Sequence, residues 1–389
     1  MSGLSELARY GFTDLSGTLS KLDLLVKLVG DSGRAALASL AKSANPDQAL
    51  NYLLTLAEIE KSKVKKLLNK EDSATRLCLL LGGSEALADL LRRKPEFLVY
   101  FEKPIADLKT VTQLTESLVS AVEKKISTSF EVTEVWSSLR SKYREELLQI
   151  AIYDLTQSDV EAGVPKVAAA LADLAGAALE AGLKVARAEL STSSEFGHFE
   201  VNEISQTRLA VMAMGKCGAR ELNYISDVDV IFVAEGAEDL SGERAVEIAT
   251  KLATRMMRAM DGNAPEAMLW QVDPNLRPEG KSGALVRTLE SHVAYYDRWA
   301  QSWEFQALLK ARPIAGDFEL GQRYVAALAP KVWASASRDS FVESAQKMRE
   351  RVTEFIPSNE VDLQIKLGPG GLRDIEFTVQ LLQLVHGRT

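Results

Sequence analysis

Two aspartates, Asp227 and Asp229, stand two residues apart at the start of an apolar run that continues to Val233. Side chains two apart on a β-strand point to the same face, so both carboxylates project together, about 7 Å apart along the backbone. The flanking aliphatic residues indicate a buried strand, where two carboxylates are unfavourable unless positive charge neutralises them. Hard divalent cations prefer carboxylate oxygens, and a phosphate completes the coordination sphere of Mg²⁺. The pair predicts a metal-dependent site for phosphate chemistry, although a strand end with a solvated edge fits the same spacing.

A glycine turn comes shortly before this pair. Gly215, Lys216 and Gly218 follow one apolar strand pattern and precede a polar segment. Glycines allow backbone N–H groups to approach a phosphate closely. The turn lacks the Gly-Lys-Ser/Thr ending of a P-loop and the third glycine of a dinucleotide fingerprint. Alone it is more typical of a structural turn, but beside the aspartate pair it favours a phosphate site.

A further apolar run ends in Asp273, a candidate third carboxylate. Arg277 and Lys281 follow it among turn residues. Cations beside three carboxylates fit a pocket that must also hold a polyphosphate. The simpler interpretation is a surface turn with a capping aspartate.

Two later segments add basic candidates. Lys310 and Arg312 fit either a solvated helix face or a pocket wall. After Lys366, a Gly-Pro-Gly-Gly loop leads into a helix whose first turn carries Arg373. A helix start of this kind can bind an anion, although the acidic residues of the same turns are favourable there in any case.

The elements that must position these residues follow from the hydrophobic pattern. Helical periodicity dominates the first half of the chain. Asn45 and Ser84 are predicted helix N-caps, and 167–190 is predicted to be one long helix. Strand patterns occur at 208–214, 227–234 and 267–273, with an amphipathic helix at 245–260, and helical patterns return from 289.

We therefore expect an α+β fold, mostly helical, with one small mixed sheet. Its predicted domains are an N-terminal helical region (1–195), a sheet-containing domain (196–288) and a C-terminal helical region (289–389). Because the last helical pattern runs almost to the final residue, we also expect the chain to be a fragment of a longer protein.

Composition narrows the classes of function. The 389 residues carry a net charge of −8, which argues against broad nucleic-acid binding because that needs a basic surface. Two cysteines and three histidines, all far apart, make a zinc cluster, a disulfide framework or a histidine-based triad improbable. We find neither a signal peptide nor an apolar run of about 20 residues, so we expect a cytoplasmic protein without membrane contact.

Taken together, the glycine turn, the Asp-x-Asp strand and the later aspartate resemble the nucleotidyltransferase superfamily with its polymerase-β-like palm. More narrowly, four segments and the helical stretch 80–95 resemble the family of bifunctional glutamine synthetase adenylyltransferase/adenylyl-removing enzymes. The four segments are Gly215–Phe232, Val272–Leu285, Trp303–Asp317 and Lys366–Gly387. The resemblance implies a small palm flanked by an N-terminal helical region and a C-terminal helical bundle.

The family has two related nucleotidyltransferase domains, of which the first removes AMP from glutamine synthetase and the second adds it. The Lys-Leu-Gly-Pro-Gly-Gly-Leu-Arg motif that starts at Lys366 is similar to the version in the first domain. The resemblance therefore implies phosphorolysis: inorganic phosphate attacks the AMP–tyrosine bond and gives ADP and unmodified glutamine synthetase. It also implies adenylylated glutamine synthetase and, for the full-length protein, a PII-type signalling protein as partners.

Three alternatives stay open. The same fold could run in the other direction, as an ATP-dependent adenylyltransferase that adds AMP to glutamine synthetase. A non-catalytic regulatory module could bind glutamine synthetase or a PII protein. A nucleotidyltransferase could also act on a small molecule or RNA.

The resemblance implies roles for the candidate residues. Three carboxylates would hold two Mg²⁺ (or Mn²⁺) ions, as in two-metal sites: Asp227, Asp229 and Asp273. The remaining candidates would contact phosphate or AMP: Gly215, Lys216, Gly218, Arg277, Lys281, Arg312 and Arg373. Cys217, Ala219 and Asn275 depart from the family pattern, and Asn275 stands where an arginine or lysine is expected.

Overall fold

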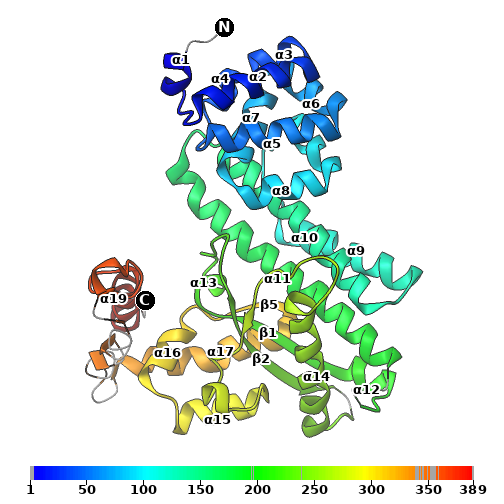
Figure 1. The fold of residues 1–389 in the computed structure, drawn as a ribbon. Coiled ribbons are helices and arrows are strands. Elements are labelled where there is room, and N and C mark those ends of the chain that lie inside the picture. Colours follow the sequence, from blue (N-terminus) through cyan, green and yellow to red (C-terminus); the bar gives the residue numbers. More distant parts are fainter. Residues whose placement is uncertain are drawn as a thin grey trace. The chain divides into compact units, whose positions relative to one another are not determined.

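The computed structural model describes residues 4–193, 195, 197–237, 239–337, 341, 343, 346, 347, 349, 350, 356, 357 and 359–387. The chain forms two compact units, and Figure 1 labels their α-helices and the strands β1, β2 and β5. Unit 1 comprises Met1–Thr110 and Tyr143–Ala170, and unit 2 comprises Val111–Lys142 and Leu171–Thr389. Two long helices each contribute residues to both units, and the domain boundaries at 195 and 288 stay predictions.

Unit 1 is helical and has its own apolar core. Its elements are α1 (Leu4–Arg9), α2 (Leu15–Val29), α3 (Asp31–Ala35), α4 (Leu37–Leu40), α5 (Pro46–Ile59), α6 (Lys61–Leu68), α7 (Glu71–Gly83), α8 (Glu85–Arg93) and η1 (Pro95–Phe101). The predicted N-caps are confirmed, since Asn45 accepts from the backbone N–H of Gln48 and Ser84 from that of Leu87. Leucines of α2, α5 and α7 fill the core, including Leu25, Leu53 and Leu77.

Three long helices follow: α9 (Val111–Thr128), α10 (Val132–Leu155) and α11 (Val160–Thr192). The long helix predicted at 167–190 is confirmed and extends further at both ends. Contrary to the sequence expectation, α11 is long and apolar enough to cross a membrane by length and composition alone. However, 67% of its most apolar window is buried inside the protein, and a core helix meets the same criteria.

A small mixed sheet lies in unit 2. Its strands are β1 (Thr207–Ala213), β2 (Val228–Gly236), β3 (Val272–Asp273), β4 (Val286–Thr288) and β5 (Arg312–Gly316). The strand order is β3-β2-β1-β5. β1 lies antiparallel to both β2 and β5, whereas β3 and β4 pair in parallel with successive stretches of β2. Together with the helices, this confirms a mostly helical α+β fold.

Two strands differ from the sequence prediction. The pattern at 267–273 yields only the two residues of β3, because Leu269 donates its backbone N–H to Met260 at the end of a helix instead of joining the sheet. Conversely, Arg312 belongs to strand β5 rather than to a helix.

Helices cover the sheet. They are α12 (Val201–Gln206), α13 (Gly215–Gly218), α14 (Gly242–Asp261), α15 (Leu289–Arg298), α16 (Ser302–Leu308), α17 (Phe318–Ala334) and α19 (Leu372–His386), with short 3₁₀ turns at η3 (Gly280–Ser282), η4 (Ser335–Ser337) and η5 (Val361–Leu363). Met212 and Ile231 pack on one face of the sheet with residues of α15, α16 and α17, such as Phe305 and Tyr324. α14 contacts β1 and β2. This packing fixes β2, which carries the candidate aspartates.

Candidate functional site

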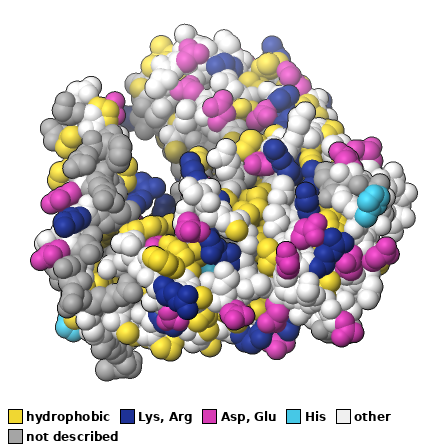
Figure 2. All heavy atoms as spheres, turned by 90° about the horizontal axis from the view of Figure 1, so that it is seen from below, with side chains coloured by type: hydrophobic (Ala, Val, Ile, Leu, Met, Phe, Trp, Pro, Cys, Tyr) yellow, Lys and Arg dark blue, Asp and Glu magenta, His cyan; other side chains and the backbone are white. Residues whose placement is uncertain are grey.

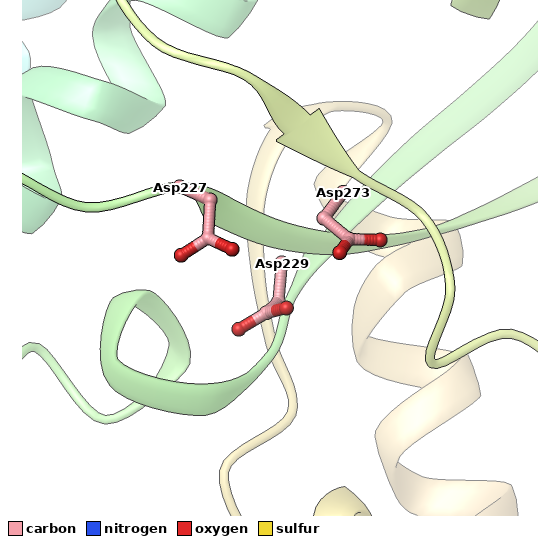
Figure 3. A group of neighbouring side chains, drawn as sticks. All are labelled: Asp227, Asp229 and Asp273. Atoms are coloured by element: carbon pink, nitrogen blue, oxygen red, sulfur yellow. The ribbon is translucent and has the colours of Figure 1, made fainter. Parts of the chain in front are cut away.

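The three candidate carboxylates converge on one point at the start of β2 (Figure 3). Asp227 lies just before β2, and Asp229 is paired directly with Asp273 in the parallel β2–β3 register. Ligand oxygens of all three lie within 4.8 Å of one another. An all-oxygen set of this size fits a hard cation such as Mg²⁺ or Mn²⁺ and does not fit a zinc site, which is usually built from nitrogen and sulfur ligands.

The surroundings of this cluster disfavour the ionised form of Asp229. Burial raises the pKa of Asp229 to about 6, and the neighbouring carboxylates of Asp227 and Asp273 add to this increase. The positive charges of Lys366 and Arg373 act in the opposite direction. A carboxylate whose pKa is raised by like charges is one that a bound cation would stabilise in its ionised form.

The glycine turn is fixed against the same cluster. Met214, just before it, donates its backbone N–H to the carbonyl of Asp229 at 2.9 Å. Gly215 has a φ of +52°, and a Cβ atom there would lie 2.6 Å from Oδ2 of Asp229. Two features therefore require glycine at this position: the positive φ of the backbone and the close carboxylate of Asp229.

The other residues of the turn have different surroundings. Lys216 lines the cleft beside the carboxylates, and its Nζ donates to Oδ1 of Asn223 at 3.2 Å. Gly218 is buried, and a Cβ atom there would lie 1.9 Å from the carbonyl oxygen of Lys310. Gly218 therefore permits close packing of the turn rather than facing the cleft.

Arg277 and Lys281 lie in the loop between β3 and β4. The guanidinium of Arg277 donates to the backbone carbonyls of Pro274, Lys281 and Gly283, so it shapes this loop. Lys281 is exposed in η3. The structure does not place either residue among those that line the cleft.

Arg312 holds the glycine turn in place through hydrogen bonds to its backbone. Its guanidinium donates to the carbonyls of Cys217 and Gly218, each at 3.0 Å. A second arginine, Arg220, forms an ion pair with the buried Asp173 of α11. Both contacts hold the turn against the body of unit 2, and Arg312 is not among the residues that line the cleft.

Asp227 and Asp229 line a cleft of about 250 Å³ within unit 2, and Asp273 lies beside them without lining it. Four basic residues line it: Lys216, Lys310, Lys366 and Arg373. They come from separate elements, and Lys310 also pairs with Glu221 at 3.1 Å. Divalent cations on the acidic side and basic side chains around them can together bind a phosphorylated ligand.

The basic residues are a local feature of the cleft. On the face of the molecule shown in Figure 2, Lys and Arg side chains are interspersed with Asp and Glu, so the described surface there carries no extended field of one sign.

Sequence reasoning missed several of the lining residues. They are Trp303, Gln306, Phe377 and Gln380. A signal was present in the spacing: the first two lie three apart on α16, and Phe377 and Gln380 lie three apart on α19, each pair on one helix face. That the two faces meet depends on contacts distant in sequence, which the pattern does not reveal.

Comparison with known proteins gives two family matches. Residues 74–327 match the family model of glutamate-ammonia ligase adenylyltransferase, and residues 340–389 match that of GlnD PII-uridylyltransferase. The first match contains the three carboxylates, and the second contains Lys366 and Arg373.

Curated relatives agree over the whole length of the chain. Proteins named "bifunctional glutamine synthetase adenylyltransferase/adenylyl-removing enzyme" are 52% identical in Leifsonia xyli, 47% in Streptomyces coelicolor and 40% in Bifidobacterium longum. The alignments cover 99–100% of this chain but 38%, 37% and 36% of the relatives, so the chain spans less than two fifths of their length. The chain therefore belongs to the glutamate-ammonia ligase adenylyltransferase family.

Proposed function

We propose that this chain removes AMP from adenylylated glutamine synthetase by phosphorolysis and that its sheet is a polymerase-β-like nucleotidyltransferase palm. The observation that carries the proposal is the group Asp227, Asp229 and Asp273, of which the first two line a cleft together with basic side chains. The names of the relatives cover both addition and removal of AMP. Removal is favoured by the Lys366–Arg373 motif, whose sequence is similar to that of the adenylyl-removing domain.

The three carboxylates would hold two divalent ions. Bound there, the ions would stabilise the attacking and the leaving oxygens of an in-line displacement. The proximity of Asp229 and Asp273 is set by their direct pairing in the sheet, which makes the ligand set rigid. Rigid placement suits Mg²⁺ and Mn²⁺, since Mg²⁺ demands near-ideal octahedral geometry.

In the proposed reaction, an oxygen of inorganic phosphate forms a bond to the phosphorus of the AMP group. The bond between that phosphorus and the tyrosine oxygen breaks, and its electron pair leaves with the phenolate. The phenolate then takes the proton that hydrogen phosphate loses as it becomes part of ADP, because tyrosine has a pKa of about 10. The products are ADP and unmodified tyrosine, so all atoms and charges are accounted for.

The chain itself contributes position and charge. Lys216, Lys366 and Arg373 would hold phosphoryl oxygens, and the glycine turn brings the backbone close to the carboxylates. No strong base is needed to activate phosphate, which is already an anion at neutral pH. Catalysis would thus consist mainly of orientation and charge neutralisation.

Adenylylated glutamine synthetase, phosphate and ADP follow as ligands, with the cytoplasm as compartment. A PII-type signalling protein is proposed as a partner of the longer protein. This is supported by the second family match, to a model named for PII uridylyltransferase, over residues 340–389.

The decisive experiment mixes the purified chain with adenylylated glutamine synthetase, Mg²⁺ and phosphate, and measures ADP together with the intact mass of the synthetase. We expect ADP and the loss of one AMP mass per subunit, dependent on phosphate and abolished by Asp229→Asn. AMP in place of ADP would mean that water attacks. AMP addition on supplying ATP, without removal, would show the opposite direction, and binding without turnover would indicate a regulatory module.

A further inference from the structure

One part of the cleft is neither acidic nor basic. Trp303 and Ala307 of α16, Phe377 and Gln380 of α19, and Leu276 form this part. α16 and α19 contact each other, so these side chains belong to one continuous wall. The charged residues of the cleft account for phosphate binding, but they do not explain an aromatic and amide-lined wall beside them.

The wall contains an amide pair, of which Gln306 is buried and Gln380 is partly buried. Gln306 is only 5% exposed, and its Nε2 donates to Oε1 of Gln380 at 2.6 Å. This bond leaves the carbonyl of Gln306 and the second half of the Gln380 amide for another partner. Together they offer one acceptor and one donor. An adenine edge offers the complementary donor and acceptor, the same two groups that it pairs with on a single glutamine amide.

The two aromatic rings provide the second requirement of a base site. Trp303 and Phe377 are each partly buried and line the same cleft as the amides. Nucleobases stack on such rings whatever their sequence context, because every base has a π-face. The guanidinium of Arg373 lies 5.7 Å from the centre of the Phe377 ring, which connects the aromatic wall to the proposed phosphate-binding residues.

We propose that Trp303 and Phe377, together with the Gln306–Gln380 pair, form the subsite for the adenine base of the nucleotide. This inference rests on the proposed function, since it assigns the base of the same AMP group whose phosphorus reacts at the carboxylates. The rings bind the face of the base, and the amide pair reads its edge. These residues thereby determine base specificity, whereas the lysines and Arg373 bind any polyphosphate.

The test measures binding of ADP, GDP and inorganic pyrophosphate to the purified chain by calorimetry in the presence of Mg²⁺. For the wild type we expect ADP to bind roughly tenfold more tightly than GDP. Trp303→Ala should weaken ADP binding about tenfold or more and leave pyrophosphate binding unchanged. Trp299→Ala is the matched control, because Trp299 lies nearby in sequence but is 69% exposed.

A second variant keeps the test valid where Trp303→Ala does not fold. Replacing both amides, as Gln306→Leu with Gln380→Leu, removes the hydrogen-bonding edge without leaving a buried partner unpaired, so the fold should persist. We expect this double variant to bind ADP and GDP equally well. Gln383→Leu, at an exposed position one turn along α19, should retain the preference for ADP.

The outcomes separate the subsite from the function. Wild-type affinity for ADP in both the Trp303 variant and the double variant would overturn the subsite and leave the proposed function standing. A wild-type chain that binds pyrophosphate but shows no preference for ADP over GDP would also overturn the subsite. A wild-type chain that binds neither ADP nor pyrophosphate would contradict the nucleotide site itself, and with it both proposals.

Discussion

The acidic and the basic sides of the cleft are built in different ways. The carboxylates of Asp229 and Asp273 stand on neighbouring strands and are paired by backbone register. The basic residues come from separate elements: Lys216 from α13, Lys310 after α16, Lys366 before α19 and Arg373 within it. The acidic side is therefore fixed by main-chain hydrogen bonds, whereas the basic side depends on the packing of distant segments.

This difference corresponds to what each side would bind under the proposed function. A small divalent cation tolerates little displacement of its ligands, so its carboxylates belong on a rigid sheet. A lysine is a point charge on a flexible stem and can follow a phosphate over a larger range. We therefore expect substitutions on the acidic side to abolish the reaction and substitutions on the basic side to weaken it by degrees.

The largest effect should follow from Asp229→Asn. This change removes one metal-binding charge while keeping the shape of the side chain, and we expect kcat to fall by at least about 10³-fold. Asp239→Asn, at an exposed position, is the matched control and should keep the wild-type rate. The measurement is ADP release at saturating Mg²⁺. A variant that retains the wild-type rate would remove Asp229 from the metal site.

A smaller but still large effect should follow from Gly215→Ala. The new Cβ would lie 2.6 Å from Oδ2 of Asp229 and would displace that carboxylate, and misplacement by about 1 Å can lower a rate by roughly 10²-fold. Gly30→Ala separates this effect from backbone strain, since Gly30 has a φ of +78° but no atom within 4 Å of an added Cβ.

Both glycine variants should lose at least about 1–2 kcal/mol of stability because each forces a positive φ on alanine, and the loss should be larger at Gly30, whose ψ of −154° suits glycine alone. Only Gly215→Ala should also lose activity and Mg²⁺ affinity. Equal activity in the two variants would show that the close contact with Asp229 has no functional consequence.

On the basic side, Lys366→Gln should raise the KM for phosphate roughly tenfold and leave the thermal midpoint unchanged, because it removes one charge-assisted contact.

Arg312→Lys should change stability rather than substrate binding. A lysine cannot reproduce the fork that binds the carbonyls of Cys217 and Gly218, so we expect a lower thermal midpoint with little change in KM. If Lys366→Gln destabilised the chain and Arg312→Lys raised the KM, then Lys366 would be the structural residue and Arg312 the ligand-binding one.

The same contrast explains how far the sequence alone was informative. Period-two spacing is local, so it predicted strand β2 and the shared direction of Asp227 and Asp229. Helix starts such as Asn45 are local as well and are confirmed by their capping hydrogen bonds. The convergence of Asp273 with the pair was expected from the order of motifs, and the structure places all three within 4.8 Å.

The remaining features depend on information that is not local. A guanidinium binds backbone carbonyls as well as it binds phosphate, so sequence could not distinguish the loop-shaping contacts of Arg277 and Arg312 from ligand contacts. The two-residue length of β3 reflects competition from the end of α14. The wall made by Trp303 and Phe377 exists only because α16 and α19 meet.

The smallest effect concerns stability without metal. In the folded chain the pKa of Asp229 is about 6, above its ordinary value of 3.8, so the folded state binds this proton more tightly than the unfolded state does. The resulting stabilisation is complete below about pH 4 and is lost as the pH rises through about 6. In the Asp229→Asn variant the side chain at this position cannot ionise, so the variant does not lose this stabilisation as the pH rises.

In EDTA, the variant should therefore become more stable than the wild type between about pH 4 and pH 6, and the difference should stay constant above that range. We expect roughly 1–2 kcal/mol, less than the full pKa shift implies, because Asp229 is only partly buried and solvent screens its charge. Carboxylates with a lowered pKa, such as Asp47 and Asp317, make the folded state more stable as the pH rises. Both proteins contain them, so their effect cancels in the comparison. Denaturant unfolding of both proteins across this pH range measures the difference.

Mg²⁺ should then stabilise the wild type above pH 6 and have little effect on the variant. The reason is that a bound cation relieves the energetic penalty of three adjacent carboxylates. A pH-independent difference would show that neither burial nor the neighbouring carboxylates raise the pKa of Asp229 in the folded chain.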